Sequence, residues 1–142
     1  MDMQNAAFPV AVNRNVGQVQ VQEIQAIDYP YFVDVRPEMM DRDNLIVAGL
    51  PAISMNWASP VQIAQEQTDL REVTILLSSS EESWTSTATN IQPDFELYPE
   101  FGFAVAESRA SYPLAVSMTG SFTSYFVDKP VPTITEIGRA HV

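Results

Sequence analysis

Carboxylates are the side chains through which this sequence could carry chemistry. Two carboxyl groups that face each other across a groove can hydrolyse a glycosidic bond, one as general acid and the other as nucleophile or base. The sequence leaves open which of them, if any, form such a pair. The candidates are Asp34, Asp41, Asp43, Glu81, Glu82, Asp94, Glu96, Glu100 and Glu107.

Residues 136–142, EIGRAHV, have the form of a translated sequencing adapter. The codons GAG-ATC-GGA-AGA-GCA-CAC-GTC encode this peptide in order and match the start of a common short-read library adapter. Scars of this kind are set aside before fold reasoning, so we interpret the chain as a fragment that is natural up to Thr135. Setting the tail aside also removes His141, which is the one histidine in the sequence.

Without that histidine, most catalytic and metal-binding arrangements lack a component. The sequence has no cysteine, so neither a Ser-His-Asp nor a Cys-His arrangement can form, and zinc lacks its preferred ligands. The five glycines form no phosphate-binding loop. The run DRDN at 41–44 resembles the first half of a calcium loop, but the later ligands of that loop are missing. We therefore expect no catalytic residue, no metal and no cofactor.

Four residues are candidates for contact with a ligand or a partner: Asp34, Arg36, Trp57 and Trp84. Asp34 lies in an apolar run and Arg36 follows at i+2, so both can project to one side of a strand end. A structural ion pair is the more common outcome, because buried acids are normally paired. The two tryptophans are most simply core or rim aromatics, and stacking on a carbohydrate is the functional alternative.

The charge distribution argues against nucleic acid as a partner. The formal net charge is −11, and the seven Lys and Arg residues are scattered singly along the 142 residues. Binding to phosphate backbones or to an anionic membrane surface needs clustered basic residues. The length predicts one domain or part of one, and no run reaches the roughly 18 consecutive apolar residues of a membrane span.

The pattern of apolar residues predicts a strand-rich chain, because no segment sustains the spacing of a long amphipathic helix. We expect residues 1–15 to be irregular and a turn to form at Asp28-Tyr29-Pro30. The run VTILL at 73–77 is typical of a strand inside a sheet that is covered on both faces. The expected strands are 16–27, 31–35, 52–58, 73–77 and 112–120.

Short helices and one long loop complete the prediction. We expect one helical turn at 45–50 and a short helix after Ser80, in whose first turn Glu81 and Glu82 would lie solvated. Residues 85–111 read as a long polar loop, which is unusual in a small domain. The aromatic residues expected to hold this loop down are Phe95, Tyr98, Phe101 and Phe103.

Four segments, taken in order, resemble a known family. They are IDYPYFVDVR at 27–36, AGLP at 48–51 leading to NWASP at 56–60, LLSSSEESW at 76–84 and YPLAV at 112–116. Together they resemble the GldG-like auxiliary component of gliding-motility-type ABC transport systems in bacteria. The resemblance covers residues 16–132, and residues 133–142 would form an open end.

The resemblance implies a fold, a function and partners. The fold would be α/β, as part of a three-layer domain with a glutamine-amidotransferase-like sheet. The function would be that of a non-catalytic binding or scaffolding subunit on the extracytoplasmic face of the cytoplasmic membrane. Its partners would be an ABC-2 type permease and, through it, a cytoplasmic ATPase. Membrane contact would be made through a C-terminal anchor that lies beyond this fragment.

Two alternatives come from other functional classes. The first is a carbohydrate-active hydrolase that uses paired carboxylates, with Asp34 or Asp94 as candidates. The second is an extracellular interaction module that is unrelated to transport.

Overall fold

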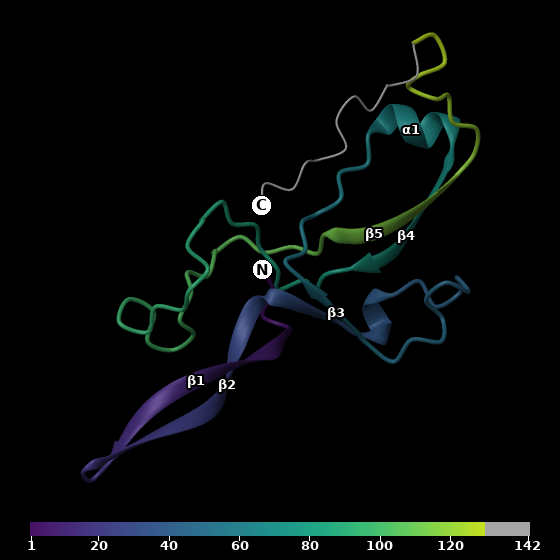
Figure 1. Ribbon diagram of the computed structural model, residues 1–142. Helices are drawn as coiled ribbons and strands as arrows, with labels where there is room; N and C mark the ends of the chain where they lie inside the picture. The colour runs from purple at the N-terminus through teal and green to yellow at the C-terminus, as the bar shows by residue number, and fades with distance from the viewer. Residues whose placement is uncertain (130–142) are drawn as a thin grey trace, which may run out of the picture.

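The computed structural model describes residues 1–129, apart from the side chains of residues 12–15 and 67 (Figure 1). The predicted open end at 133–142, with its adapter-like tail, lies outside the described residues. Within them the chain is mostly β-sheet with little helix. The elements are β1 (Asn5–Val16), β2 (Val19–Val35), the 3-10 helix η1 (Pro37–Met39), β3 (Ile53–Asn56), α1 (Gln65–Leu70), β4 (Glu72–Ser78) and β5 (Pro113–Thr119).

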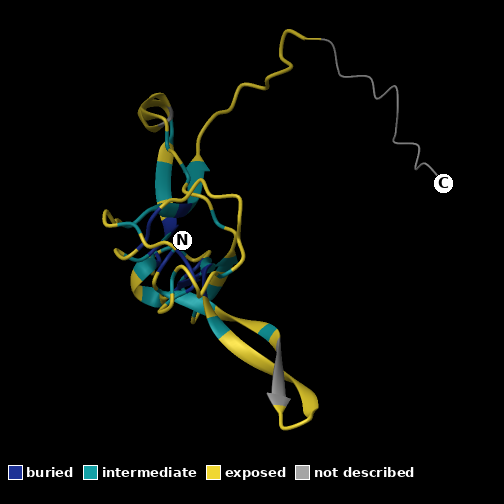
Figure 2. Cartoon of the chain, turned by 90° about the vertical axis from the view of Figure 1, so that its left-hand side faces the viewer, coloured by how far each residue is buried: buried dark blue, intermediate teal, exposed yellow. Residues whose placement is uncertain are grey.

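Strands β1 and β2 form a long antiparallel hairpin that projects from the rest of the chain (Figure 1). Val16 pairs with Val19, so the loop between the strands has two residues, and Gly17 takes a φ of 64° at its first position. Glycine at that position is what a type II′ turn requires, and this turn matches the twist of the strands. The part of the hairpin between residues 7 and 28, which we call the arm, is mostly exposed (Figure 2).

The second half of β2 leaves the arm and enters the core. Residues 32–35 pair antiparallel with β3, and β4 pairs antiparallel with β5 in a separate two-stranded sheet. Buried side chains from β2, β4, β5 and the segment after η1 pack together between the two sheets. They are Val33, Val35, Met40, Val47, Leu76, Leu77 and Leu114.

The first four residues tie the two sheets together, and we call them the strap. The amide of Asp2 donates to the carbonyl of Pro30 in β2 at 2.9 Å. The carboxylate of Asp2, which is fully buried, accepts from the amide of Ser80 after β4 at 2.9 Å and also from the Ser80 hydroxyl. The amide of Gln4 donates to the same carboxylate at 2.9 Å. One buried acid therefore satisfies three donors and connects β2 to the end of β4.

Two predictions for the first 35 residues are wrong. The segment expected to be irregular contains β1, because the apolar run AAFPVAV at 6–12 is extended and pairs with β2, which supplies its hydrogen bonds. The expected turn at 28–30 is absent and β2 runs through it. The register of the pair shifts between Asn5 and Ala7, opposite this stretch, and proline is tolerated in a strand where a bulge interrupts the ladder.

The strands expected around 52–58, 73–77 and 112–120 are confirmed by β3, β4 and β5. The expected cover on both faces of β4 is wrong for Ile75, which is 43% exposed while Leu76 and Leu77 are buried. The pairing with β5 shifts in register between Ile75 and Leu77, and such a bulge interrupts the regular alternation of side chains, so Leu76 and Leu77 are both buried while Ile75 is not.

The helix predictions also differ from the structure. Residues 45–50 form hydrogen-bonded turns, with the amide of Ala48 bonded to the carbonyl of Asn44 at 2.9 Å. No helix follows Ser80 within the described residues, because Ser83 forms an isolated bridge with Asp2 and the backbones of Trp84 and Met1 each donate one hydrogen bond to the other. The helix that does form, α1, was not predicted.

We predict that Asp2→Asn lowers the free energy of unfolding by about 1–3 kcal/mol, because an amide cannot accept from all three donors and one is left buried without a partner. Chemical denaturation followed by tryptophan fluorescence measures this change. The matched control is Asp28→Asn, which makes the same substitution at an exposed position of the arm. Equal stability of the two variants would contradict the role given to Asp2.

Candidate functional site

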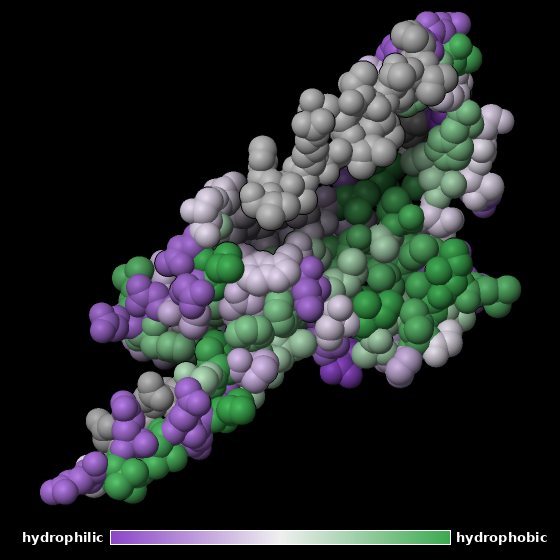
Figure 3. Space-filling model, viewed as in Figure 1, coloured by the Kyte–Doolittle hydropathy of each residue, from purple (hydrophilic) through white to green (hydrophobic). Residues whose placement is uncertain are grey.

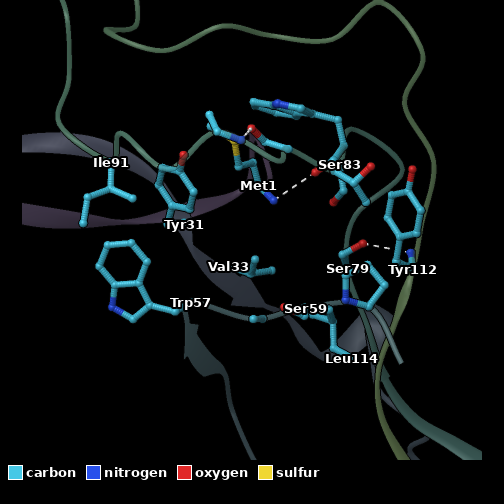
Figure 4. Close-up of a pocket in the computed structure, with 16 residues that line it drawn as sticks. Met1, Tyr31, Val33, Trp57, Ser59, Ser79, Ser83, Ile91, Tyr112 and Leu114 are labelled. Carbon is cyan, nitrogen blue, oxygen red and sulfur yellow. Dashed lines mark hydrogen bonds between the residues drawn. The ribbon is translucent and has the colours of Figure 1, made fainter. Parts of the chain in front are cut away.

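A cavity of about 290 Å³ lies between the second half of β2, the residues after β3 and the segment that follows β4 (Figure 4). Both tryptophans of the chain line it. Other residues of its wall that matter below are Tyr31, Ser59, Ser83 and Tyr112. Side chains separated by up to about eighty positions in the sequence therefore meet at one place.

Trp57 and Tyr31 form one wall of the cavity. Their ring centroids lie 5.3 Å apart and their planes are inclined by 33°. The amide of Trp57 donates to the carbonyl of Tyr31 at 2.8 Å, just beyond the paired part of β3. Trp57 has a φ of 59°, a left-handed conformation that costs a residue with a side chain about 1–2 kcal/mol. The indole is 48% exposed. The strained backbone of Trp57 therefore presents an aromatic face at the cavity.

Ser83 and Trp84 belong to the opposite wall. The amide of Trp84 donates to the carbonyl of Met1 at 2.9 Å, and the indole packs against Phe101. Trp84 is 3% exposed and Ser83 is 2% exposed. The hydroxyl of Ser83 is buried and has no hydrogen-bond partner within the described residues. A buried hydroxyl without a partner is uncommon in proteins and calls for an explanation.

The end of the cavity near β5 is held by hydrogen bonds between Ser79 and Tyr112. The Tyr112 amide donates to the Ser79 hydroxyl and the Ser79 amide donates to the Tyr112 carbonyl, each at 2.9 Å. The hydroxyl of Ser111 adds a bond to the Ser79 carbonyl at 2.7 Å. This part of the wall is therefore fixed by the start of β5.

Tyr29 connects the base of the arm to the long loop. Its hydroxyl donates to the carbonyl of Ile91 at 3.0 Å, and its ring packs edge-on against Phe103. Burial raises the pKa of the Tyr29 phenol, and the neighbouring Tyr31 adds to the effect. The neutral phenol is thus favoured, which keeps its donated hydrogen bond. Phe103 is buried and Phe95 is exposed, so the prediction that aromatics hold the loop down is right for Phe103 and wrong for Phe95.

Asp34 and Arg36 form an ion pair away from this cavity. Arg36 Nε donates to Asp34 Oδ2 at 2.7 Å, and its Nη2 contacts the same oxygen. Asp34 is buried and the Arg36 side chain is 51% exposed. The backbone of Asp34 is also bonded to Gln4 of the strap in both directions. The expected pairing of these two charges is confirmed, and the pair lies at the C-terminal end of β2.

The other predicted carboxylates make local structural contacts. Asp94 accepts from the amides of Glu96 at 3.1 Å and Leu97 at 2.9 Å, as in a turn cap. Asp41 accepts from the amide of Asp43 at 3.3 Å. Glu82 forms an ion pair with Arg109 in place of the expected helix start. Within residues 1–129, no group of three acidic, histidine or cysteine side chains is arranged to hold a metal ion.

Two of the four predicted candidates, Trp57 and Trp84, thus line the cavity, whereas Asp34 and Arg36 do not. Sequence reasoning missed Ser83 and Tyr31, because a serine in a polar run and a tyrosine in a strand give no signal by themselves. Their role depends on the strap, which brings residues 83 and 84 opposite the end of β2.

Comparison with protein families gives a match over residues 1–140 to a family described as an ABC-type uncharacterized transport system. The chain belongs to this family of auxiliary transport components. Comparison with curated proteins and with solved structures gave no match.

Membership of the ABC-type transport auxiliary family supports the broader part of the resemblance found in the sequence. It associates the chain with an ABC transport system in an auxiliary role. As for the membrane itself, residues 1–129 contain no helix of the length and apolar character needed to cross a bilayer.

We predict that Ser83→Ala raises the free energy of unfolding by about 1 kcal/mol, because it removes a buried hydroxyl that has no partner. Thermal unfolding of the two proteins measures this. The matched control is Ser79→Ala, which removes a hydroxyl that accepts from the Tyr112 amide and should destabilise the chain. A loss of stability in Ser83→Ala as large as in Ser79→Ala would mean that the Ser83 hydroxyl is satisfied.

Proposed function

We propose that this chain is a non-catalytic, GldG-like subunit of a gliding-motility-type ABC-2 transport system in bacteria. In this proposal it lies on the extracytoplasmic face of the cytoplasmic membrane and docks on the permease, which couples it to the cytoplasmic ATPase. Residues 16–132 would form the GldG-like unit. The exposed arm is the observation that supports docking, because the chain belongs to a family of auxiliary transport components.

One face of the arm carries exposed valines near the turn of the hairpin. Alternation along the paired strands directs Val19, Val21 and Ile27 to the same face as Phe8, Val10 and Val16, and the polar Glu23 and Gln25 also lie on this face. Val16 is 58% exposed, Val19 is 64% exposed and Val21 is 45% exposed. The opposite face carries Gln20 and Gln22, followed by the exposed Ile24. Figure 3 shows hydrophobic and hydrophilic residues side by side along the arm.

Such an arm is weakly stabilised by itself and is suited to docking on a partner. An isolated two-stranded hairpin is at best marginally stable in water. Contiguous exposed apolar residues bordered by polar ones are typical of interaction sites. Docking would cover the exposed valines near the turn of the hairpin.

A second exposed apolar region lies in the segment after η1, where Leu45 is 95% exposed and Ile46 is 64% exposed. Figure 3 shows hydrophobic residues gathered on that side of the molecule. This region is short and turn-rich, so it offers less continuous surface than the arm. We assign the main contact to the arm.

The proposed larger fold follows the same resemblance. Apart from the isolated bridge between Met40 and Leu77, the outer edges of the β4–β5 ladder pair with no strand of residues 1–129. Unpaired edges accept further strands readily. A three-layer domain of the glutamine-amidotransferase type would extend the sheets at such edges.

The hydrolase alternative finds less support. It requires two carboxylates across a groove, whereas Asp34 is paired with Arg36 and Asp94 caps a turn. Asp94 also lines a second cavity, together with Tyr31 and Tyr98, and no other acidic residue lines that cavity.

Co-purification with the permease tests the proposal. The adjacent reading frames are expected to encode an ABC-2 type permease and an ATPase, and the tagged chain is expected to retain the co-expressed permease in detergent. We predict that Val19→Glu with Val21→Glu reduces the recovered permease at least about tenfold, because two charges would be buried in the contact.

The control for this experiment is Gln20→Glu with Gln22→Glu, which adds the same two charges to the other face of the arm. The control should retain the permease. Equal loss in both variants, equal retention in both, or neighbouring frames that encode no transporter would contradict the proposed docking.

A further inference from the structure

We propose that the cavity between Trp57 and Ser83 binds a neutral saccharide, with one sugar ring seated against the indole of Trp57. This inference does not depend on docking to the permease. It assigns a ligand class to a site that the family description leaves without one.

The Ser83 hydroxyl is the first observation that points to a ligand. Ser83 lines the cavity and is 2% exposed, and its buried hydroxyl has no partner within residues 1–129. A hydroxyl both donates and accepts a hydrogen bond, so a buried one is complementary to a ligand group that can do the same. The hydroxyl groups of a sugar have this property.

The strained tryptophan is the second observation. A bulky residue at a φ of 59° is a backbone outlier, and such outliers persist where the surroundings hold them, often at binding sites. Here the outlier presents a half-exposed indole beside Tyr31 (Figure 4). The electron-rich face of an indole attracts positively polarised edges, which the C–H faces of a sugar ring supply.

The remaining lining argues for a neutral ligand of small size. Of the residues that line the cavity, none has an acidic or basic side chain, and several carry hydroxyls, including Ser59, Thr85 and Ser86. The α-amino group of Met1 is the ionisable group of the lining; it donates to the Trp84 carbonyl at 2.9 Å, and burial lowers its pKa, which favours its neutral form. A cationic ligand would lose its hydration there without an opposite charge to replace it. The volume of about 290 Å³ is near the lower end of ligand sites, which run from roughly 300 to 1,000 Å³. It suits a single ring better than a peptide segment.

The two tryptophans make the test direct, because both indoles of the chain line the cavity. The chain is labelled with ¹⁵N and titrated with methyl glycosides of glucose, galactose and N-acetylglucosamine. We expect at least one of these to shift the Trp57 indole N–H signal in a saturable way, with a Kd in the millimolar range. Tri-alanine amide and inorganic phosphate serve as comparators and should leave the signal unchanged.

Two variants separate ligand contact from folding. Ser83→Ala should weaken binding about five- to tenfold without loss of thermal stability. Trp57→Asn should weaken it at least about tenfold, followed by the Trp84 indole signal, because asparagine accepts a left-handed φ but has no aromatic face. The matched control is Phe95→Asn, which removes a ring that is also 48% exposed but does not line the cavity; binding should be unchanged.

Three results would overturn the proposal. They are the absence of a saturable shift with every glycoside, affinity that is unchanged in both Ser83→Ala and Trp57→Asn, and a stronger response to tri-alanine amide than to any glycoside.

Discussion

The buried carboxylate of Asp2 holds this structure together. It satisfies donors from Gln4 and Ser80, while the amide of the same residue is bonded to Pro30 of β2. A buried charge is tolerated only when its hydrogen-bonding capacity is filled, so these bonds stabilise one arrangement of the two sheets strongly over others. The strap also pairs Met1 with Trp84, which sets Ser83 and Trp84 opposite Trp57. The cavity therefore exists because a short N-terminal segment connects β2 to the residues after β4.

The chain divides into a packed body and an exposed arm. Side chains such as Val35 and Leu77 are buried between the two sheets, whereas Val19 and Ile24 on the arm are mostly exposed. Apolar burial provides most of the stability of a small domain, so the body can hold its shape by itself, and in our proposal a partner covers the arm. This division suits an auxiliary component of a transport system, which must keep its own structure and also attach to another protein.

Sequence reasoning was most successful where a local pattern determines the structure. The apolar run at 73–77 and the alternation at 52–58 became β4 and β3, and Asp34 paired with Arg36 as its spacing indicated. It failed where contacts between residues that are distant in the sequence determine the structure. The segment before Val16 is interrupted by Pro9 and by Asn13-Arg14-Asn15, and its ladder of hydrogen bonds is supplied by β2, which lies beside it. The Gly17-Gln18 pair between two valines was an available hairpin signal. Nothing local marks Asp2 as buried, since its partner Ser80 is 78 positions away.

Hydrogen exchange of the chain, alone and in complex with the permease, tests the docking role of the arm most directly. Amides in weakly packed hairpins open and exchange readily, so a partner that covers the arm should slow their exchange. We expect residues 10–25 to gain protection in the complex, while the core of β2 and β4 exchanges slowly in both states. Protection that appears at residues 44–50 and leaves the arm unchanged would contradict it.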